Sequence, residues 1–178
     1  GRKPPPMTDL ARTPAAQRTP LATPLFRALW IATIVSNIGT WMNDVGSSWL
    51  MTSLSPSPLW VAMVQAATTL PMFLFALPGG ALADVVDRRK LLIASQVLIL
   101  VGAATLAGTT HFGLTTPLVL LALTAVMGLG AALSAPAFQA IVPELVEKPA
   151  LADAIALNSL GINIARAIGP AMGGVIVA

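Results

Sequence analysis

Five long apolar runs, separated by short connections, constrain this chain more than any other feature of its sequence. The runs cover residues 28–51, 59–83, 91–108, 117–140 and 154–178. A helix needs about 20 apolar residues to cross the roughly 30 Å of hydrocarbon in a bilayer, and each of the first four runs is close to or above that length. The fifth run is still apolar at Ala178, so we expect the sequence to end inside a fifth helix. The pattern predicts an all-α membrane protein.

The composition suits a chain that is solvated mainly by lipid. Only 10% of the residues are charged and 56% are hydrophobic, whereas a soluble domain carries roughly 25% charged residues. The formal net charge is +3, but the basic residues lie between the apolar runs and form no basic face with aromatic residues, which argues against nucleic-acid binding. The chain has no Cys and a single His. The sequence therefore predicts no metal site and no cofactor.

The connections predict how the chain is oriented in the membrane. Residues 1–24 are rich in Pro, Thr and Arg and are typical of a disordered tail, which precedes a helical bundle over residues 25–178. Lys and Arg occur in this tail, between the second and third runs and between the fourth and fifth, but not in the loops after the first and third runs. Because cytoplasmic loops carry an excess of Lys and Arg, we predict a cytoplasmic N-terminus.

The first run contains several polar residues on one side. Spacings of three and four place Asn37, Thr40, Asp44 and Ser47 on the same face of a helix. Asp44 lies about 24 Å along this helix from residue 28, at roughly 1.5 Å per residue, which is in the outer half of the membrane. A carboxylate that faces lipid is costly. Asp44 is therefore expected either to face a partner or a polar cavity, or to reach water at the outer interface.

The connection between the second and third runs has a distinctive spacing. Asp84 comes four residues after Gly80, and Arg88 comes four residues after Asp84. A Gly at the end of a membrane helix allows another helix to approach closely. Asp84 is able to pair with Arg88 or to lie near a helix N-terminus, where a negative charge is favoured.

This connection resembles the loop between helices two and three of the major facilitator superfamily, which reads G-x-x-x-D-R/K-x-G-R-R/K. The matching residues are Gly80, Asp84, Arg88 and Arg89. Val85 and Asp87 depart from the pattern, and the variant with an Asp before the arginines is similar to the siderophore-exporter branch. The resemblance implies that this loop, Asp87 included, is a cytoplasmic latch that favours the outward-facing state. The alternative is that its basic residues only set the topology.

The fifth run resembles the same superfamily independently. Its antiporter motif ends G-P-x-x-G-G, which is reproduced by Gly169, Pro170, Gly173 and Gly174. Upstream the match is weaker, because Ala165 replaces a Gly and Gly161 is one residue out of register. The resemblance implies an exporter. The alternative is the close packing by small residues that helices in lipid commonly need.

Polar residues in the last two runs add candidates and one departure. Asn163 and Arg166 form a polar stripe with Asn158 or Ser159. Arg166 lies about 15 Å into its helix, where a guanidinium needs an anion or a polar cavity. It is expected either to bind an acidic group of a substrate or to form a structural ion pair. In the fourth run, Thr124 occupies the position at which the superfamily often has a basic residue linked to proton movement.

The resemblance implies the N-terminal half of a twelve-helix major facilitator fold, with about four complete transmembrane helices and a truncated fifth. It implies a secondary transporter in the inner (plasma) membrane of a bacterium. Such a protein would export a small molecule, namely a siderophore, a drug or a metabolite, by proton antiport, and would not be an enzyme. The candidates for transport and proton coupling are Asp44, Asn37, Arg166 and Asn163.

The partners expected for such a chain are its substrate, protons, the lipid bilayer and the missing C-terminal half, without which we expect no activity. One alternative is a membrane scaffold or partner subunit that transports nothing. Another is a lipid-modifying membrane enzyme that uses Asp84 and Asp87. Such an enzyme needs further carboxylates to hold a metal ion, and the third run contains none.

Overall fold

The computed structural model describes residues 19–177, apart from the side chains of residues 76–77 and 79–84. The roles predicted for the Gly80 and Asp84 side chains therefore lie outside the described residues, as does the predicted disordered tail up to residue 18. The last six residues of that tail are described. Within them, Pro20–Ala22 form a short 3-10 helix, η2, and Pro20 is buried. Structured backbone thus begins earlier than predicted, because Leu21 packs against the apolar cluster around Phe26.

Five α-helices make up the described chain. They are α1 (Pro24–Leu54), α2 (Pro58–Val85), α3 (Arg88–His111), α4 (Pro117–Leu145) and α5 (Leu151–Val177), with a 3-10 helix, η3 (Lys148–Ala150), before α5. The five helices confirm the predicted all-α fold. Most of them extend a few residues beyond the predicted runs; α4, for example, ends at Leu145 and not at residue 140. The extensions arise because polar and proline residues at the ends of apolar runs are also able to form helical turns.

The helix starts have clear local causes. Pro24, Pro58 and Pro117 occupy first helical positions, where the missing N–H of proline costs nothing. Asp87 caps α3, since its carboxylate accepts hydrogen bonds from the backbone N–H of Arg89 at 3.0 Å and of Lys90 at 3.2 Å. Such a side-chain cap satisfies N–H groups that have no partner within the helix.

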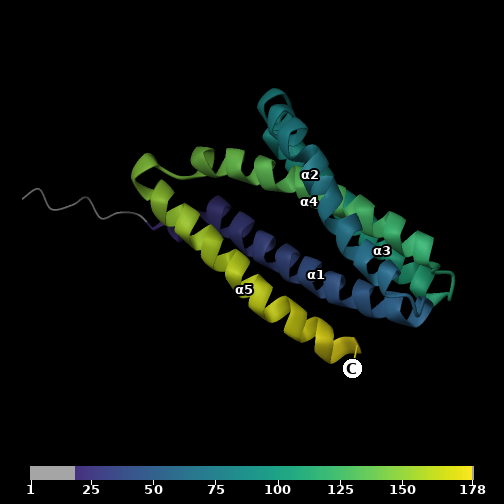
Figure 1. The fold of residues 1–178 in the computed structure, drawn as a ribbon. Coiled ribbons are helices and arrows are strands. Elements are labelled where there is room, and N and C mark those ends of the chain that lie inside the picture. The colour runs from purple at the N-terminus through teal and green to yellow at the C-terminus, as the bar shows by residue number, and fades with distance from the viewer. Residues whose placement is uncertain (1–18, 178) are drawn as a thin grey trace, which may run out of the picture.

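The helices form two groups that meet along α1 (Figure 1). In one group α4 packs against both α2 and α3, and in the other α1 and α5 lie side by side along most of their lengths. Fewer contacts join the groups, and most of them run from α1 to α2 and α4. The first of the described helices, α1, is therefore paired with the fifth, α5.

Four of the described helices are long and apolar enough to cross a membrane: α2 through its segment Pro58–Phe75, α3, α4, and α5 together with η3. The α1 helix is longer than any of these, at 31 residues, but its polar residues keep it out of this set. That α1 also spans the membrane remains a prediction from its length and from its packing beside α5.

Two clusters of buried apolar side chains lie at opposite ends of the bundle. The Phe26 cluster joins the start of α1 to the start of α3 and the end of α4; its buried members are Phe26, Leu91, Leu92, Ala137, Phe138, Val142 and Ala154. The Met51 cluster lies at the other end, and its buried members are Met51, Val64, Leu106, Leu120 and Met127. The middle of the bundle lies between them, and that is where the polar residues of α1 are found.

Candidate functional site

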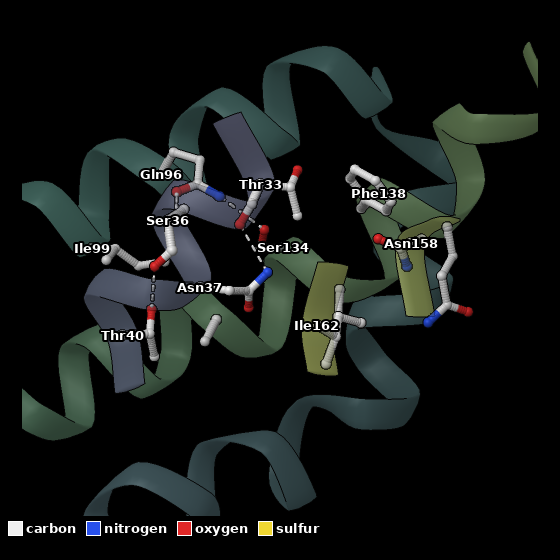
Figure 2. A pocket seen from close by; sticks show the side chains of 13 residues that line it. Thr33, Ser36, Asn37, Thr40, Gln96, Ile99, Ser134, Phe138, Asn158 and Ile162 are labelled. Carbon is white, nitrogen blue, oxygen red and sulfur yellow. Dashed lines mark hydrogen bonds between the residues drawn. The ribbon is translucent and has the colours of Figure 1, made fainter. Parts of the chain in front are cut away.

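A polar cavity of about 160 Å³ lies between α1, α3, α4 and α5 (Figure 2). We call it the Asn37 cavity. Its polar lining consists of Thr33, Ser36, Asn37, Thr40, Gln96, Ser134, Gln139 and Asn158. None of these side chains carries a formal charge, and together they provide both hydrogen-bond donors and acceptors. The predicted candidate Asn37 therefore lies in a cavity, where its side-chain amide donates to the backbone carbonyl of Thr33 at 2.9 Å.

Gln96 forms a hydrogen-bonded bridge across this cavity. Its side-chain oxygen accepts from the Ser36 hydroxyl on α1 at 3.0 Å. Its side-chain nitrogen donates to the Ser134 hydroxyl on α4 at 3.2 Å. Figure 2 shows the three side chains converging from three different helices. The bridge joins α1 to the group formed by α2, α3 and α4.

The predicted candidate Asp44 lines a second cavity, of about 260 Å³, formed by α1, α2, α3 and α4. We call it the Asp44 cavity. Its other polar side chains are Ser36, Thr40, Asn43, Thr68, Gln96 and Thr124. Of the two expectations for Asp44, the structure favours a cavity over simple exposure at the outer interface, because the residue is only partly exposed. No Lys, Arg or His is present among the described residues that line this cavity.

Two hydroxyl groups near this region are buried without a hydrogen-bond partner among the described residues: Ser47 Oγ and Thr124 Oγ1. Both residues are about 2% exposed. Buried hydroxyls usually find a partner in the protein or in ordered water. Thr124, where the superfamily often has a basic residue, therefore contributes an unpaired hydroxyl to the Asp44 cavity.

Arg166 and Asn163 lie apart from both cavities. Both residues are exposed on α5. The Asn163 side-chain amide donates to the Ser159 carbonyl at 2.9 Å. The Arg166 guanidinium lies over the Trp41 ring of α1, 5.5 Å from the ring centroid, which is within the range of a cation–π interaction. The structure thus places Asn37 and Asp44 in two different cavities along α1, and neither Arg166 nor Asn163 lines either cavity.

The glycines of α5 pack against α1 at very short range. Gly161, Gly169 and Gly173 are buried, and Ala165 between them is fully buried, so small residues recur every four positions. A methyl group added at Gly161 would lie 2.9 Å from Ile34 Cγ1, and one added at Gly173 would lie 3.2 Å from the Met42 carbonyl oxygen.

The four residues of the antiporter motif do not share one environment. At Gly169 an added methyl group would lie 3.0 Å from the Ile38 carbonyl oxygen and closer still to Trp41 Cβ. At Gly174 nothing lies within 4 Å. Gly169 and Gly173 therefore serve close helix packing, as small residues do in membranes. Gly174 and Pro170, by contrast, are only half-buried.

The connection between α2 and α3 is tied to the end of α4. Arg88 forms an ion pair with Glu144, and its guanidinium also donates to the Ala140 carbonyl at 3.1 Å. A cation is favoured at a helix C-terminus. Asp87, which departs from the family pattern, is the cap of α3, and Arg89 is exposed beside it.

Sequence reasoning did not single out Ser36, Gln96, Ser134 or Gln139. The only available signal was a single side-chain amide in each of two apolar runs, Gln96 in the third and Gln139 in the fourth. Such a residue does not show which side chain it will bond to. No group of three or more His, Cys, Asp or Glu residues within the described part of the chain is placed to hold a metal ion.

A family model described as "transmembrane secretion effector", within the major facilitator superfamily, matches residues 15–178. The chain belongs to this family. The match confirms the resemblance seen in the 80–90 connection and in the fifth run. It also supports a multi-pass membrane protein and argues against the alternative of a membrane enzyme.

Among curated proteins, the staphyloferrin A transporter of Staphylococcus aureus is 31% identical over 145 residues, which cover 79% of this chain and 36% of that protein. The enterobactin exporter EntS of Salmonella choleraesuis is 26% identical over 155 residues, which cover 87% of this chain and 37% of that protein. The chain thus spans little more than a third of the length of these relatives. No solved structure matches it.

Proposed function

We propose that this chain is the N-terminal part of a secondary transporter that exports a small molecule across the bacterial cytoplasmic membrane in exchange for protons. The observation that carries the proposal is the position of Asp44, whose carboxylate lines a cavity between four helices that holds no basic side chain among its described lining residues. A carboxylate inside a membrane bundle is a candidate for a proton-carrying group. Asn37 lies on the same helix and lines the adjoining cavity.

The proposed substrate class is that of siderophores. It is supported by the two relatives, since one is named a staphyloferrin A transporter and the other an enterobactin exporter. The direction of transport is supported by the name of the exporter and by the motif Gly169-Pro170…Gly173-Gly174. A drug or another metabolite is the remaining alternative for the cargo.

The proposed orientation has the N-terminus in the cytoplasm. It is supported by the positions of Arg27, Arg88, Arg89, Lys90 and Lys148, which lie at the end of the bundle that holds the Phe26 cluster. We also propose that the chain alone does not transport, because the relatives it matches are more than twice as long and transporter sites lie between two repeats.

We propose that residues 80–89 act as a conformational latch, with Gly80, Asp84, Asp87, Arg88 and Arg89 as its members. The contact of Arg88 with Glu144 and the Ala140 carbonyl anchors one end of this segment to α4. The exposed Arg89 remains available to the other half of the transporter.

The experiment uses the full-length gene in a bacterium that lacks its own siderophore exporter and measures the siderophore released into the medium. Asp44→Asn is expected to lower export by about 100-fold or more, because the substitution removes the titrating group. Asp44→Glu retains that group and serves as the matched control. Dissipating the pH gradient with an ionophore should lower wild-type export in the same way.

Normal export by Asp44→Asn, with an unchanged pH profile, would contradict the role of Asp44. Export by cells that express residues 1–178 alone would contradict the proposal that the rest of the transporter is required.

A further inference from the structure

The Asn37 and Asp44 cavities are adjacent to each other. Five residues line both of them: Ser36, Thr40, Gln96, Ile99 and Ala131. On α1 the combined lining of the two cavities extends from Thr33 to Asp44, which is about 16 Å at roughly 1.5 Å per residue. Gln96 stands at the junction, held by Ser36 on one side and by Ser134 on the other.

We propose that these two cavities form one water-filled compartment through which protons reach Asp44, and that Gln96 controls the passage between its two parts. The inference rests on the proposed proton coupling, and it adds the route and a residue that neither the sequence motifs nor the relatives point to.

The volumes allow water. The cavities measure about 160 and 260 Å³, roughly ten or more times the 10–15 Å³ that a single water molecule requires. Water also needs two to four polar partners to be stable inside a protein. The hydroxyl and amide groups of the lining supply them.

The polar lining has unused hydrogen-bonding capacity. The hydroxyls of Thr40 and Thr68 donate to the carbonyls of Ser36 at 3.0 Å and of Val64 at 3.1 Å. Their oxygen atoms therefore retain lone pairs that are able to accept from water. The buried hydroxyl of Thr124 has no partner among the described residues. Water in the Asp44 cavity would satisfy it, and this observation is independent of the proposed proton chemistry.

Only one of the described residues that line the two cavities has a side chain that is able to bind the proton. Asp44 is the only titratable side chain among the described residues lining the two cavities, on α1, α2, α3, α4 and α5 alike. Arg166 of α5 lies over Trp41 and outside both cavities, and Arg27 of α1 and Arg88, Arg89 and Lys90 of α3 line neither of them. In the proposed step, a hydronium ion gives its proton to the Asp44 carboxylate and becomes water. Release reverses the transfer, and only O–H bonds form and break.

Each part of the compartment is lined by one side chain from a buried apolar cluster. Phe138 of the Phe26 cluster lines the Asn37 cavity. Met127 of the Met51 cluster lines the Asp44 cavity. In the proposed route, protons pass Gln96 to travel from one part to the other, because Gln96 lines both cavities.

The test measures proton arrival at Asp44 directly in the full-length transporter, reconstituted in lipid vesicles. After a rapid pH jump, time-resolved infrared spectroscopy follows the carboxylic-acid band that Asp44→Asn removes. Gln96→Leu fills the passage with an apolar side chain. It is expected to lower the rate at which the carboxylic-acid band appears by about tenfold, which is less than the effect of removing an acid–base group itself. Gln96→Ser leaves room for water and is expected to restore the wild-type rate to within about twofold.

Gln65→Leu is the matched control, because Gln65 is exposed on α2 and lines neither cavity. A wild-type rate in Gln96→Leu would overturn the inference. So would a rate in Gln96→Ser as slow as in Gln96→Leu, since Gln96 would then act only as a tie between helices. If the wild-type protein exported no siderophore but protons still reached Asp44 at a rate that depended on Gln96, the proposed export function would be contradicted and the proton route would stand.

Discussion

The two faces of α1 are packed in opposite ways. Toward α5, Gly161, Ala165, Gly169 and Gly173 form what we call the close seam, in which a methyl group added at any of the three glycines would lie within 3.2 Å of an α1 atom. Toward α3 and α4, the polar seam contains the Asn37 and Asp44 cavities and the Gln96 bridge. In lipid, helices associate through packing and hydrogen bonds and gain no hydrophobic drive. The difference indicates that the close seam stabilises the bundle while the polar seam is kept open for function.

The largest effect is expected from Gly169→Leu, which breaks the close seam. The added side chain would collide with Trp41 and with the Ile38 carbonyl, and such overpacking costs about 3 kcal/mol. Thermal unfolding of the purified protein in detergent measures this. Gly174→Leu is the matched control, because nothing lies within 4 Å of an added methyl group there. Equal losses in both variants would show that the close seam is not the source of stability.

A smaller effect is expected from removing one interhelical hydrogen bond from each seam. In the close seam, Trp30→Phe deletes the indole N–H that donates to the Leu157 carbonyl at 2.9 Å, and we expect a cost of about 1 kcal/mol. In the polar seam, Ser134→Ala deletes the acceptor of the Gln96 amide, and we expect about 0.5 kcal/mol, near the average for such bonds in membranes. Unfolding measurements compare the two. A larger loss in Ser134→Ala would reverse the assignment of roles.

The smallest effect is expected from Arg166→Ala, at the exposed edge of the close seam. The cation–π contact with Trp41 is worth about 0.5 kcal/mol at an exposed site, so unfolding should change little. Whether Arg166 binds an acidic group of the substrate is decided by measuring how anionic and neutral substrates bind to the full-length variant. Equal weakening of both would exclude a role for Arg166 in binding a substrate anion, whereas selective loss of the anionic substrate would support that role.

Hydropathy predicted most of the fold. Helix length in apolar runs depends only on local sequence, and α1–α5 were found close to where the runs lie. Their ends were less predictable, because turns such as Pro20–Ala22 form through packing on the Phe26 cluster. The shared face of Asn37 and Asp44 was predicted as well, since it follows from helical spacing on a single element.

The partners of α1 were not predictable from one sequence. Gln96 and Ser134 meet Ser36 only because the faces of α3 and α4 that carry them point toward α1. The sequence of an apolar run in lipid says little about which face of its helix points toward a neighbour. Arg166 illustrates the same limit. Its depth along α5 was calculable, but its direction toward Trp41 depends on which face the close seam occupies. The seam in turn begins at Gly161, a residue out of register with the family motif.

The pairing of the first helix with the last has a consequence for biosynthesis. The bond between Trp30 and Leu157 joins residues 127 positions apart, so the close seam cannot form until α5 has left the ribosome. At about 5–20 residues per second, α1 waits roughly 6–25 s for its main partner. During that interval the helix with the most polar residues is the one without its principal neighbour. Closing the bundle is thus a long-range and comparatively slow event.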